Sequence, residues 1–114
     1  MSKVQESTLF LDDNPSIKDF HKYVKQLEIE RDFSHQTVIQ KCLMLGEEVG
    51  ELFKAIRKSE KISVDPNSKI GSIGDELADI FIYILAIANR YDINLEDAFR
   101  KKEEINKQRT WKIN

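Results

Sequence analysis

The chain has 114 residues with 18 basic and 20 acidic side chains, so its formal net charge is −2. This length fits one domain, and a nucleic-acid partner is not expected because it would require a concentrated basic surface. Apolar residues make up 40% and charged residues 33%, a balance that is typical of a globular protein and not of a disordered one. A domain this small buries a modest fraction of its surface, so we expect it to pair with other copies.

The sequence predicts neither a membrane span nor a secretion signal. The longest apolar run, from Ile80 to Ala88, is about half of what a membrane span needs. The N-terminus lacks the basic-then-apolar order of a signal peptide. The single cysteine, Cys42, lies in an apolar run and is expected to be a small buried side chain. These features predict a cytoplasmic chain without an internal disulfide.

The elements are predicted to be helices, because no alternating strand pattern persists and glycine and proline are few. Residues 1–13 are predicted to be a flexible N-terminal arm, followed by a single helical domain over residues 14–114. The first helix should begin at residues 14–16 and end near Asp32. Either Asn14 caps it, with Pro15 at the first helical position, or Ser16 caps it, with Asp19 three residues later.

The second helix is predicted from about Thr37 to Ser59. Its apolar stripe at helical spacing comprises Val38, Cys42, Leu45, Val49, Leu52, Phe53 and Ile56. A linker is expected around residues 65–68, and a third helix from about Ile73 to Tyr91. That helix is apolar almost all round over residues 80–88, which is typical of a helix buried in the middle of an assembly. A fourth helix is expected to follow the cap Asn94 and to continue to about Arg109.

Two pairs of carboxylates, each three residues apart, share a helix face. Glu48 and Glu51 lie beside the apolar stripe of the second helix. On the third helix, Glu76 and Asp79 lie on a flank that is otherwise apolar. Buried carboxylates facing each other would repel or become protonated, and a divalent cation with hard oxygen ligands resolves this. The pattern therefore favours a Mg²⁺ site, with Mn²⁺ as an alternative.

A simpler interpretation also exists for these carboxylates. Glutamate pairs at helical spacing are often solvated faces, and buried ones are usually paired with a lysine or an arginine. Lys41 and Arg90 are the basic partners that this interpretation would use.

Three blocks, in this order, resemble the MazG-like all-α nucleoside triphosphate pyrophosphohydrolases. They are GEEVGEL over residues 46–52, DELAD over residues 75–79, and a Lys-x-x-x-Asn-x-x-Arg run from Lys102 through Asn106 to Arg109. A tyrosine, Tyr83, follows the second block by one turn. The resemblance spans about residues 20–111, and residues 76–109 are similar to the dCTP pyrophosphatase branch.

The resemblance implies a four-helix MazG-type bundle that hydrolyses a nucleoside triphosphate to a monophosphate and pyrophosphate. It implies metal ligands at Glu48, Glu51, Glu76 and Asp79. It also implies contacts from Lys102, Asn106 and Arg109 to the phosphates or sugar, with Tyr83 bordering the nucleotide pocket. Members of the family are commonly homodimers or homotetramers, so the site is expected to use residues from more than one chain.

Further residues are weaker candidates. Glu47 is either a water-activating base or a plain surface residue, and Phe33 either stacks on a base or closes the core beneath its loop. His35 is expected to be a loop or capping residue. Lys58 stands where the dCTP-specific branch has an aromatic residue, and it could instead reach a phosphate. Val24 stands near that branch's histidine, so base selectivity is not specified.

The sequence therefore predicts an all-α, oligomeric, Mg²⁺-dependent nucleoside triphosphate pyrophosphohydrolase of the nucleotide pool. Two alternatives remain. One is a phosphoribosyl-ATP pyrophosphohydrolase of the same superfamily. The other is a non-catalytic helical interaction module stabilised by metal.

Overall fold

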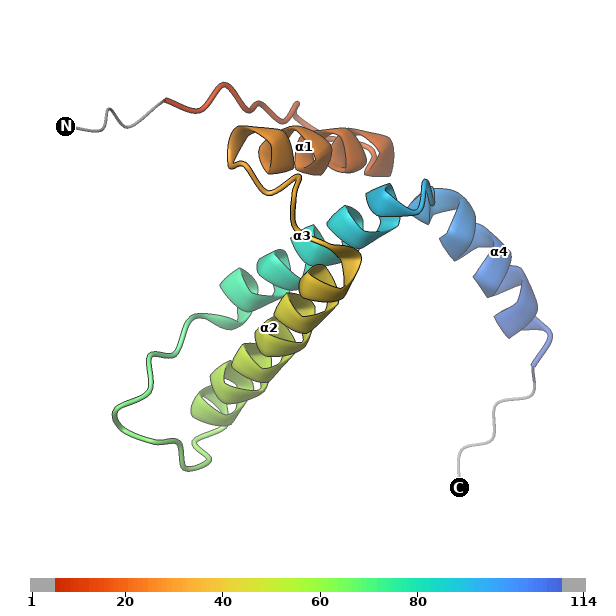
Figure 1. Cartoon of the computed structure of the whole chain (residues 1–114). Helices are drawn as coiled ribbons and strands as arrows, with labels where there is room; N and C mark the ends of the chain where they lie inside the picture. Colours follow the sequence, from red (N-terminus) through yellow and green to blue (C-terminus); the bar gives the residue numbers. More distant parts are fainter. Residues whose placement is uncertain (1–5, 110–114) are drawn as a thin grey trace.

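The computed structural model describes residues 6–109, which contain four helices and no strand. They are α1 (Ile17–Glu30), α2 (Val38–Ser59), α3 (Ile73–Arg90) and α4 (Leu95–Lys107), shown in Figure 1. The all-α prediction is confirmed, and each expected helix is present with ends within two residues of the expected ones. Within the described residues, no helix combines the length and apolar character needed to cross a bilayer.

Each helix begins at a side chain that accepts a hydrogen bond from the first turn. Ser16, Thr37, Ser72 and Asn94 are the four caps, each accepting from the backbone N–H three residues later. Of the two caps considered for α1, Ser16 is the one used. Asp19 accepts a reciprocal bond from the Ser16 N–H at 2.9 Å. Asn14 lies before the helix with a positive φ of 53°. Capping therefore sets where the helices start.

The first three helices end in the same tight turn, with a non-glycine residue in the left-handed region. These residues are Asp32, Lys61 and Asp92. After α1, the Phe33 N–H donates to the Glu28 carbonyl oxygen at 2.7 Å, and the Asp32 N–H donates to Ile29 at 3.2 Å. This pair of bonds is the Schellman arrangement. It turns the chain back at Phe33, so that the loop from α1 to α2 stays close to the end of α1.

Helix α3 lies at the centre, packing along α2 on one side and against α1 on the other (Figure 1). The fully buried apolar cluster, Val24, Leu27, Leu85 and Ala86, comes from α1 and α3. Phe20 and Phe81 add an edge-to-face ring contact with centroids 5.3 Å apart. Helix α4 packs against α1 and extends beyond the last turn of α3.

The segment before α1 follows that helix in the part that is described. The Ser7 hydroxyl and the Thr8 N–H both donate to the Glu30 carboxylate, and Leu9 packs against the core cluster. Residues 1–5 of the predicted arm and residues 110–114 of the predicted domain lie outside the described residues.

The face that α2 turns toward α3 coincides only in part with the predicted stripe, of which Val38, Leu45, Val49 and Leu52 are half-buried. Cys42 is exposed, as are Phe53 and Ile56, so the expectation of a buried cysteine is wrong. The buried line instead runs from Lys41 to Ala55, with Glu48 half-buried between them. The predicted stripe extended too far toward solvent because charged side chains occupy part of the line that faces α3.

Only part of the apolar surface of α3 is buried within one chain. Leu85, Ala86 and Ala88 are buried, whereas Leu77 and Ile84 are 51% and 38% exposed. These exposed side chains leave room for contacts that one copy of the chain does not make.

A histidine joins three of the elements. Leu95 N–H donates to His21 Nε2 at 3.0 Å, so Nδ1 must carry the ring proton and donate to Asn89 Oδ1 at 2.8 Å. The Asn89 amide in turn donates to the His21 carbonyl oxygen at 2.9 Å. His21 therefore ties α1 to the end of α3 and to the start of α4.

We expect His21→Ala to lower the free energy of unfolding by about 1–3 kcal/mol, because it leaves the Asn89 oxygen and the Leu95 N–H without their partner. Denaturant titration measures this change. The neighbouring exposed Lys22→Ala is the control and should change stability by less than about 0.5 kcal/mol. Equal stability of the two variants would contradict the structural role of His21.

Candidate metal centre

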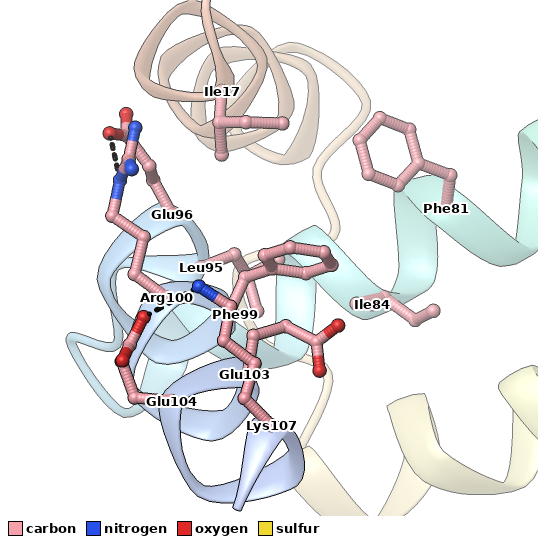
Figure 2. Close-up of a pocket in the computed structure, with 10 residues that line it drawn as sticks. All are labelled: Ile17, Phe81, Ile84, Leu95, Glu96, Phe99, Arg100, Glu103, Glu104 and Lys107. Carbon is pink, nitrogen blue, oxygen red and sulfur yellow. Dashed lines mark hydrogen bonds and ion pairs between the residues drawn. The ribbon is translucent and has the colours of Figure 1, made fainter.

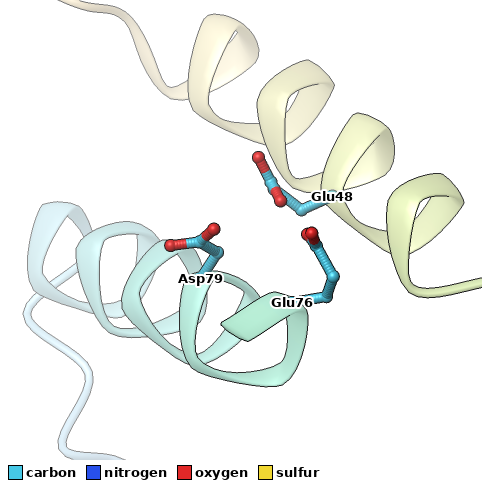
Figure 3. A group of neighbouring side chains, drawn as sticks. All are labelled: Glu48, Glu76 and Asp79. Carbon is cyan, nitrogen blue, oxygen red and sulfur yellow. The ribbon is translucent and has the colours of Figure 1, made fainter. Parts of the chain in front are cut away.

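Three carboxylates from two helices meet at the seam between α2 and α3 (Figure 3). Glu48 comes from α2, and Glu76 and Asp79 come from the first turns of α3. One oxygen of each lies within 4.8 Å of the other two. Three hard oxygen donors this close together form a donor set that suits Mg²⁺ or Mn²⁺.

Local structure places these side chains. Ser72 caps α3 by accepting from the Asp75 N–H at 3.0 Å, which fixes the helix start four residues before Glu76. Glu76 and Asp79 then project from one face. The backbone at Gly71 also passes close to the Glu76 side chain, so that a Cβ at this position would overlap Glu76 Oε1. Glu76 is only 8% exposed as a result of this enclosure.

The electrostatics of the group are unfavourable without a cation. The pKa of Glu48 is raised from 4.5 to about 7, first by burial, then by its hydrogen bond with Glu76 and by the negative charge of Asp79. A proton shared between carboxylates is the usual response when like charges cannot all ionise. A divalent cation would replace that proton, so the residues present fit the metal that the sequence predicts.

The other two acidic candidates lie at the edge of this group. The Glu51 carboxylate is not one of the three that converge, and it pairs with Lys54 at 3.6 Å. Its charge still contributes to the raised pKa of Glu48. Glu47 is exposed on α2.

Tyr83 is half-buried beside the acidic group. The pKa of its phenol is raised, first by burial and then by the negative charges of Glu48, Asp79 and Glu47. The tyrosine that the sequence assigned to the nucleotide pocket therefore borders the carboxylates.

The simpler interpretation of the carboxylates named the wrong ion pairs. Lys41 Nζ lies 3.1 Å from Glu28 Oε2, and Arg90 Nη2 lies 2.8 Å from the same oxygen. Both cations are thus paired with a residue of α1 and not with the carboxylates of the seam. Sequence reasoning missed Glu28, although it lies beside the core residue Leu27, and a carboxylate on an apolar face was the signal used for Glu76.

The remaining candidates lie at different places. Phe33 is half-buried in the loop between α1 and α2, and His35 is exposed in the same loop, 4.0 Å from Asp32. Lys58 is exposed in the last turn of α2. None of these three is among the converging side chains.

The predicted Lys-Asn-Arg line is carried by α4 and the residues that follow it. Lys102 and Arg109 are exposed, and the half-buried Asn106 donates to Glu103 at 2.8 Å. Helix α4 follows the last turn of α3, whereas Glu76 lies in its first turn (Figure 1). One chain therefore does not bring this line to the carboxylates.

Comparison with known proteins identifies the family of the chain. The family model for the MazG nucleotide pyrophosphohydrolase domain matches residues 33–110. The chain belongs to the MazG family. The matched span contains every residue predicted for the site, from Phe33 to Arg109. The predicted resemblance and the MazG-type all-α fold are thereby confirmed.

Individual relatives are similar to the chain over most of its length. Mouse dCTP pyrophosphatase 1 is 29% identical over 101 residues, which cover 83% of this chain and 59% of the relative. The chain thus spans about three-fifths of that protein's length. Two crystal structures of iMazG from Vibrio DAT 722 match with a TM-score of 0.62 and 30% identity. They cover 81% of this chain and 98% and 94% of the solved chains.

The raised pKa of Glu48 predicts how stability depends on pH. Because the folded state holds this proton more tightly than the unfolded state, the contribution of Glu48 is full below its ordinary pKa of 4.5 and is lost as pH rises through about 7. Metal-free protein should therefore lose stability over this interval, and Mg²⁺ should restore it above pH 7. Denaturant titrations with EDTA or with Mg²⁺ measure both effects. Glu48→Gln should flatten the pH dependence and remove the response to metal. A metal response that persists unchanged in this variant would contradict the assignment.

The enclosure of Glu76 gives a second prediction. Gly71→Ala should push the Glu76 carboxylate aside and weaken Mn²⁺ binding by about tenfold, while the melting temperature changes little, because only the end of a flexible side chain must move. Titration calorimetry with Mn²⁺ measures the affinity. The matched control is Gly74→Ala, where the nearest atom to the new Cβ is Ser72 Oγ at 4.0 Å. Equal Mn²⁺ affinities in the two variants would show that metal binding does not depend on the present position of the Glu76 carboxylate.

Proposed function

We propose that this chain is a Mg²⁺-dependent nucleoside triphosphate pyrophosphohydrolase. Water would be added across the bond between the α- and β-phosphates, giving a nucleoside monophosphate and pyrophosphate. The observation that carries the proposal is the convergence of Glu48, Glu76 and Asp79 within 4.8 Å at a seam of a MazG-family fold.

The carboxylates would hold the metal. Glu48, Glu76 and Asp79 supply the first oxygen ligands, and Glu51 completes the set that the family pattern implies. Bound Mg²⁺ would neutralise charge on the triphosphate and on the leaving pyrophosphate, and Mn²⁺ would substitute for it. Glu47 is exposed next to Glu48 on α2, and it is our candidate for the group that accepts a proton from the attacking water.

The nucleotide would lie along the same seam. Tyr83 borders the acidic group and would contact the sugar or base, with Phe33 and Lys58 as further contacts. Cytosine nucleotides are the first substrates to test, because the mouse relative is named dCTP pyrophosphatase 1. The lysine at position 58 and the valine at position 24 differ from that branch, so the other bases belong in the same panel.

Pyrophosphate release is the direct test. Purified protein with Mg²⁺ should release pyrophosphate, and not orthophosphate, from at least one nucleoside triphosphate. A panel of dNTPs, NTPs and phosphoribosyl-ATP separates this activity from that of a phosphoribosyl-ATP pyrophosphohydrolase. Orthophosphate as first product would overturn the cleavage position. Metal-dependent stability with no turnover at all would favour a non-catalytic helical module.

The ligand assignment has its own test. Glu76→Gln and Asp79→Asn should each lower kcat by more than about 100-fold, the upper range for losing a residue that only supports a metal ligand. Glu60→Gln, at the exposed end of α2, is the control and should retain full activity. Full activity in either carboxylate variant would sink the assignment.

We also propose that the active form is a homodimer or homotetramer whose site is shared between chains. A mainly apolar groove of about 960 Å³ lies among α1, α3 and α4 (Figure 2), and Glu48, Glu76 and Asp79 are not among the residues that line it. Its floor includes Phe81, Ile84 and Phe99, and Phe99 is 70% exposed. A second copy covering this groove would bury these side chains, and its α4 would bring Lys102, Asn106 and Arg109 to the phosphates.

Oligomerisation and sharing of the site can be tested together. Phe99→Glu should reduce the oligomer to monomers in light scattering, whereas Phe10→Glu, at a side chain that is 75% exposed before α1, should not. Mixing inactive Glu76→Gln with inactive Lys102→Ala should restore roughly a quarter of wild-type activity in randomly assorted dimers with two shared sites. If verified mixed oligomers regain no activity, Glu76 and Lys102 of the same chain act together in one site.

A further inference from the structure

A second charged cluster lies at the α2–α3 seam, and nothing in the proposed chemistry uses it. Glu28 and Lys41 are 5% and 2% exposed, and Arg90 joins them through the same carboxylate oxygen. The cluster carries two positive charges and one negative charge. An apolar set of similar volume would often stabilise a fold equally well, so stability alone does not explain why the charges are kept.

Arg90 fastens the loop that carries Phe33. Its Nη1 donates to the Gln36 carbonyl oxygen at 2.6 Å, and its Nη2 donates to the Phe33 carbonyl oxygen at 3.2 Å as well as to Glu28. The loop is closed internally by the Gln36 N–H, which donates to the Phe33 carbonyl at 3.0 Å. The planar guanidinium therefore fixes two carbonyl groups of one short loop, a geometry that a lysine cannot reproduce.

Lys41 lies between two aromatic rings. Its Nζ is 4.8 Å from the centroid of Phe33 and 5.7 Å from that of Tyr83. Both distances fall within the range of a cation–π attraction, which is stronger where the cation is desolvated. A single buried ammonium thus holds the ring of the loop and the ring of α3 in one arrangement.

The position of the cluster relates it to the acidic site. Lys41 precedes Glu48 by seven residues on α2, which is two helical turns or roughly 10 Å along the same line. Tyr83 follows Asp79 by four residues on α3 and so lies on the same side of that helix. The two rings therefore lie along the seam from the carboxylates, and Tyr83 is within about one helical turn of Asp79.

We propose that Glu28, Lys41 and Arg90 are positioning residues that hold the Phe33 and Tyr83 rings for binding of the nucleoside part of the substrate. This inference rests on the proposed function. The cluster touches neither the metal ligands nor the reacting phosphates, so it should govern substrate affinity and not the chemical step.

Lys41→Met tests the cluster, because it keeps the length of the stem, removes the ammonium and leaves Glu28 paired with Arg90. With the triphosphate that the wild type uses best, KM should rise by about tenfold while kcat stays within about twofold, which is the signature of lost binding common to ground and transition states. Mn²⁺ affinity in the absence of nucleotide should not change. Lys25→Met, at an exposed lysine of α1, is the matched control and should behave as wild type.

Arg90→Lys is the second variant, and it keeps the proposal testable if Lys41→Met does not fold. It retains a positive charge at a side chain that is 23% exposed, but it loses the fork to the loop. We expect faster hydrogen exchange at the Gln36 amide together with the same rise in KM.

Three results decide the matter. A folded variant with wild-type KM would overturn the proposal, and so would a fall in kcat accompanied by weaker Mn²⁺ binding, because the cluster would then act on the metal site. If the wild type releases no pyrophosphate from any triphosphate, the proposed function fails by itself. The variants are then compared through the dissociation constants of the Mg²⁺ complexes of dCTP and the other dNTPs, and equal constants would overturn the positioning role.

Discussion

Repulsion among Glu48, Glu76 and Asp79 is the constraint around which this small fold is arranged. When all three are ionised, carboxylates within 4.8 Å oppose the packing of α2 against α3, and burial together with these neighbours raises the pKa of Glu48. The contacts that keep the helices together must therefore lie elsewhere. They are found along the rest of the α2–α3 contact, in the α1–α3 core around Leu85, and in the cluster of Glu28, Lys41 and Arg90, where both cations pair with one carboxylate. The seam is thus acidic at one end and net positive at the other.

Helix α1 has a role that its modest length does not suggest. It supplies the apolar side chains Val24 and Leu27 to the core. It also supplies the Glu28 carboxylate, which pairs with Lys41. The Schellman turn at its end begins at the carbonyl of the same residue, Glu28, so the side chain and the backbone of one residue fix the cluster and the loop together. His21 then connects α1 to the start of α4. A disturbance of α1 would consequently reach the seam without touching any carboxylate of the acidic site.

The sequence predicted the helices well because their signals are local. Caps such as Thr37 and Asn94 and the absence of any strand pattern define four segments whatever their packing. In the sequence, spacing of three residues and an apolar flank singled out Glu76 and Asp79, whereas Glu48 was assigned to the same site through this pair and the family resemblance. The partners of Lys41 and Arg90 were not predictable, because they depend on how α1 crosses the other helices. The buried side of α2 was predicted only in part, for a related reason. Lys41 and Glu48 interrupt its apolar pattern, so the more apolar side, with Cys42 and Phe53, looked like the core.

The separation of charge along the seam also limits how a substrate can bind. A triphosphate is strongly anionic at one end and aromatic at the other, and only the carboxylate end of the seam offers ligands for the metal that accompanies its phosphates. The other end offers two rings and a buried Lys41 that is ion-paired with Glu28, so it presents mainly aromatic surface to a substrate. The spacing of seven positions from Lys41 to Glu48 separates these ends by two helical turns. The direction in which a nucleotide lies along the seam would then follow from the order of Lys41 and Glu48 on α2. No contact with the base is needed to set it.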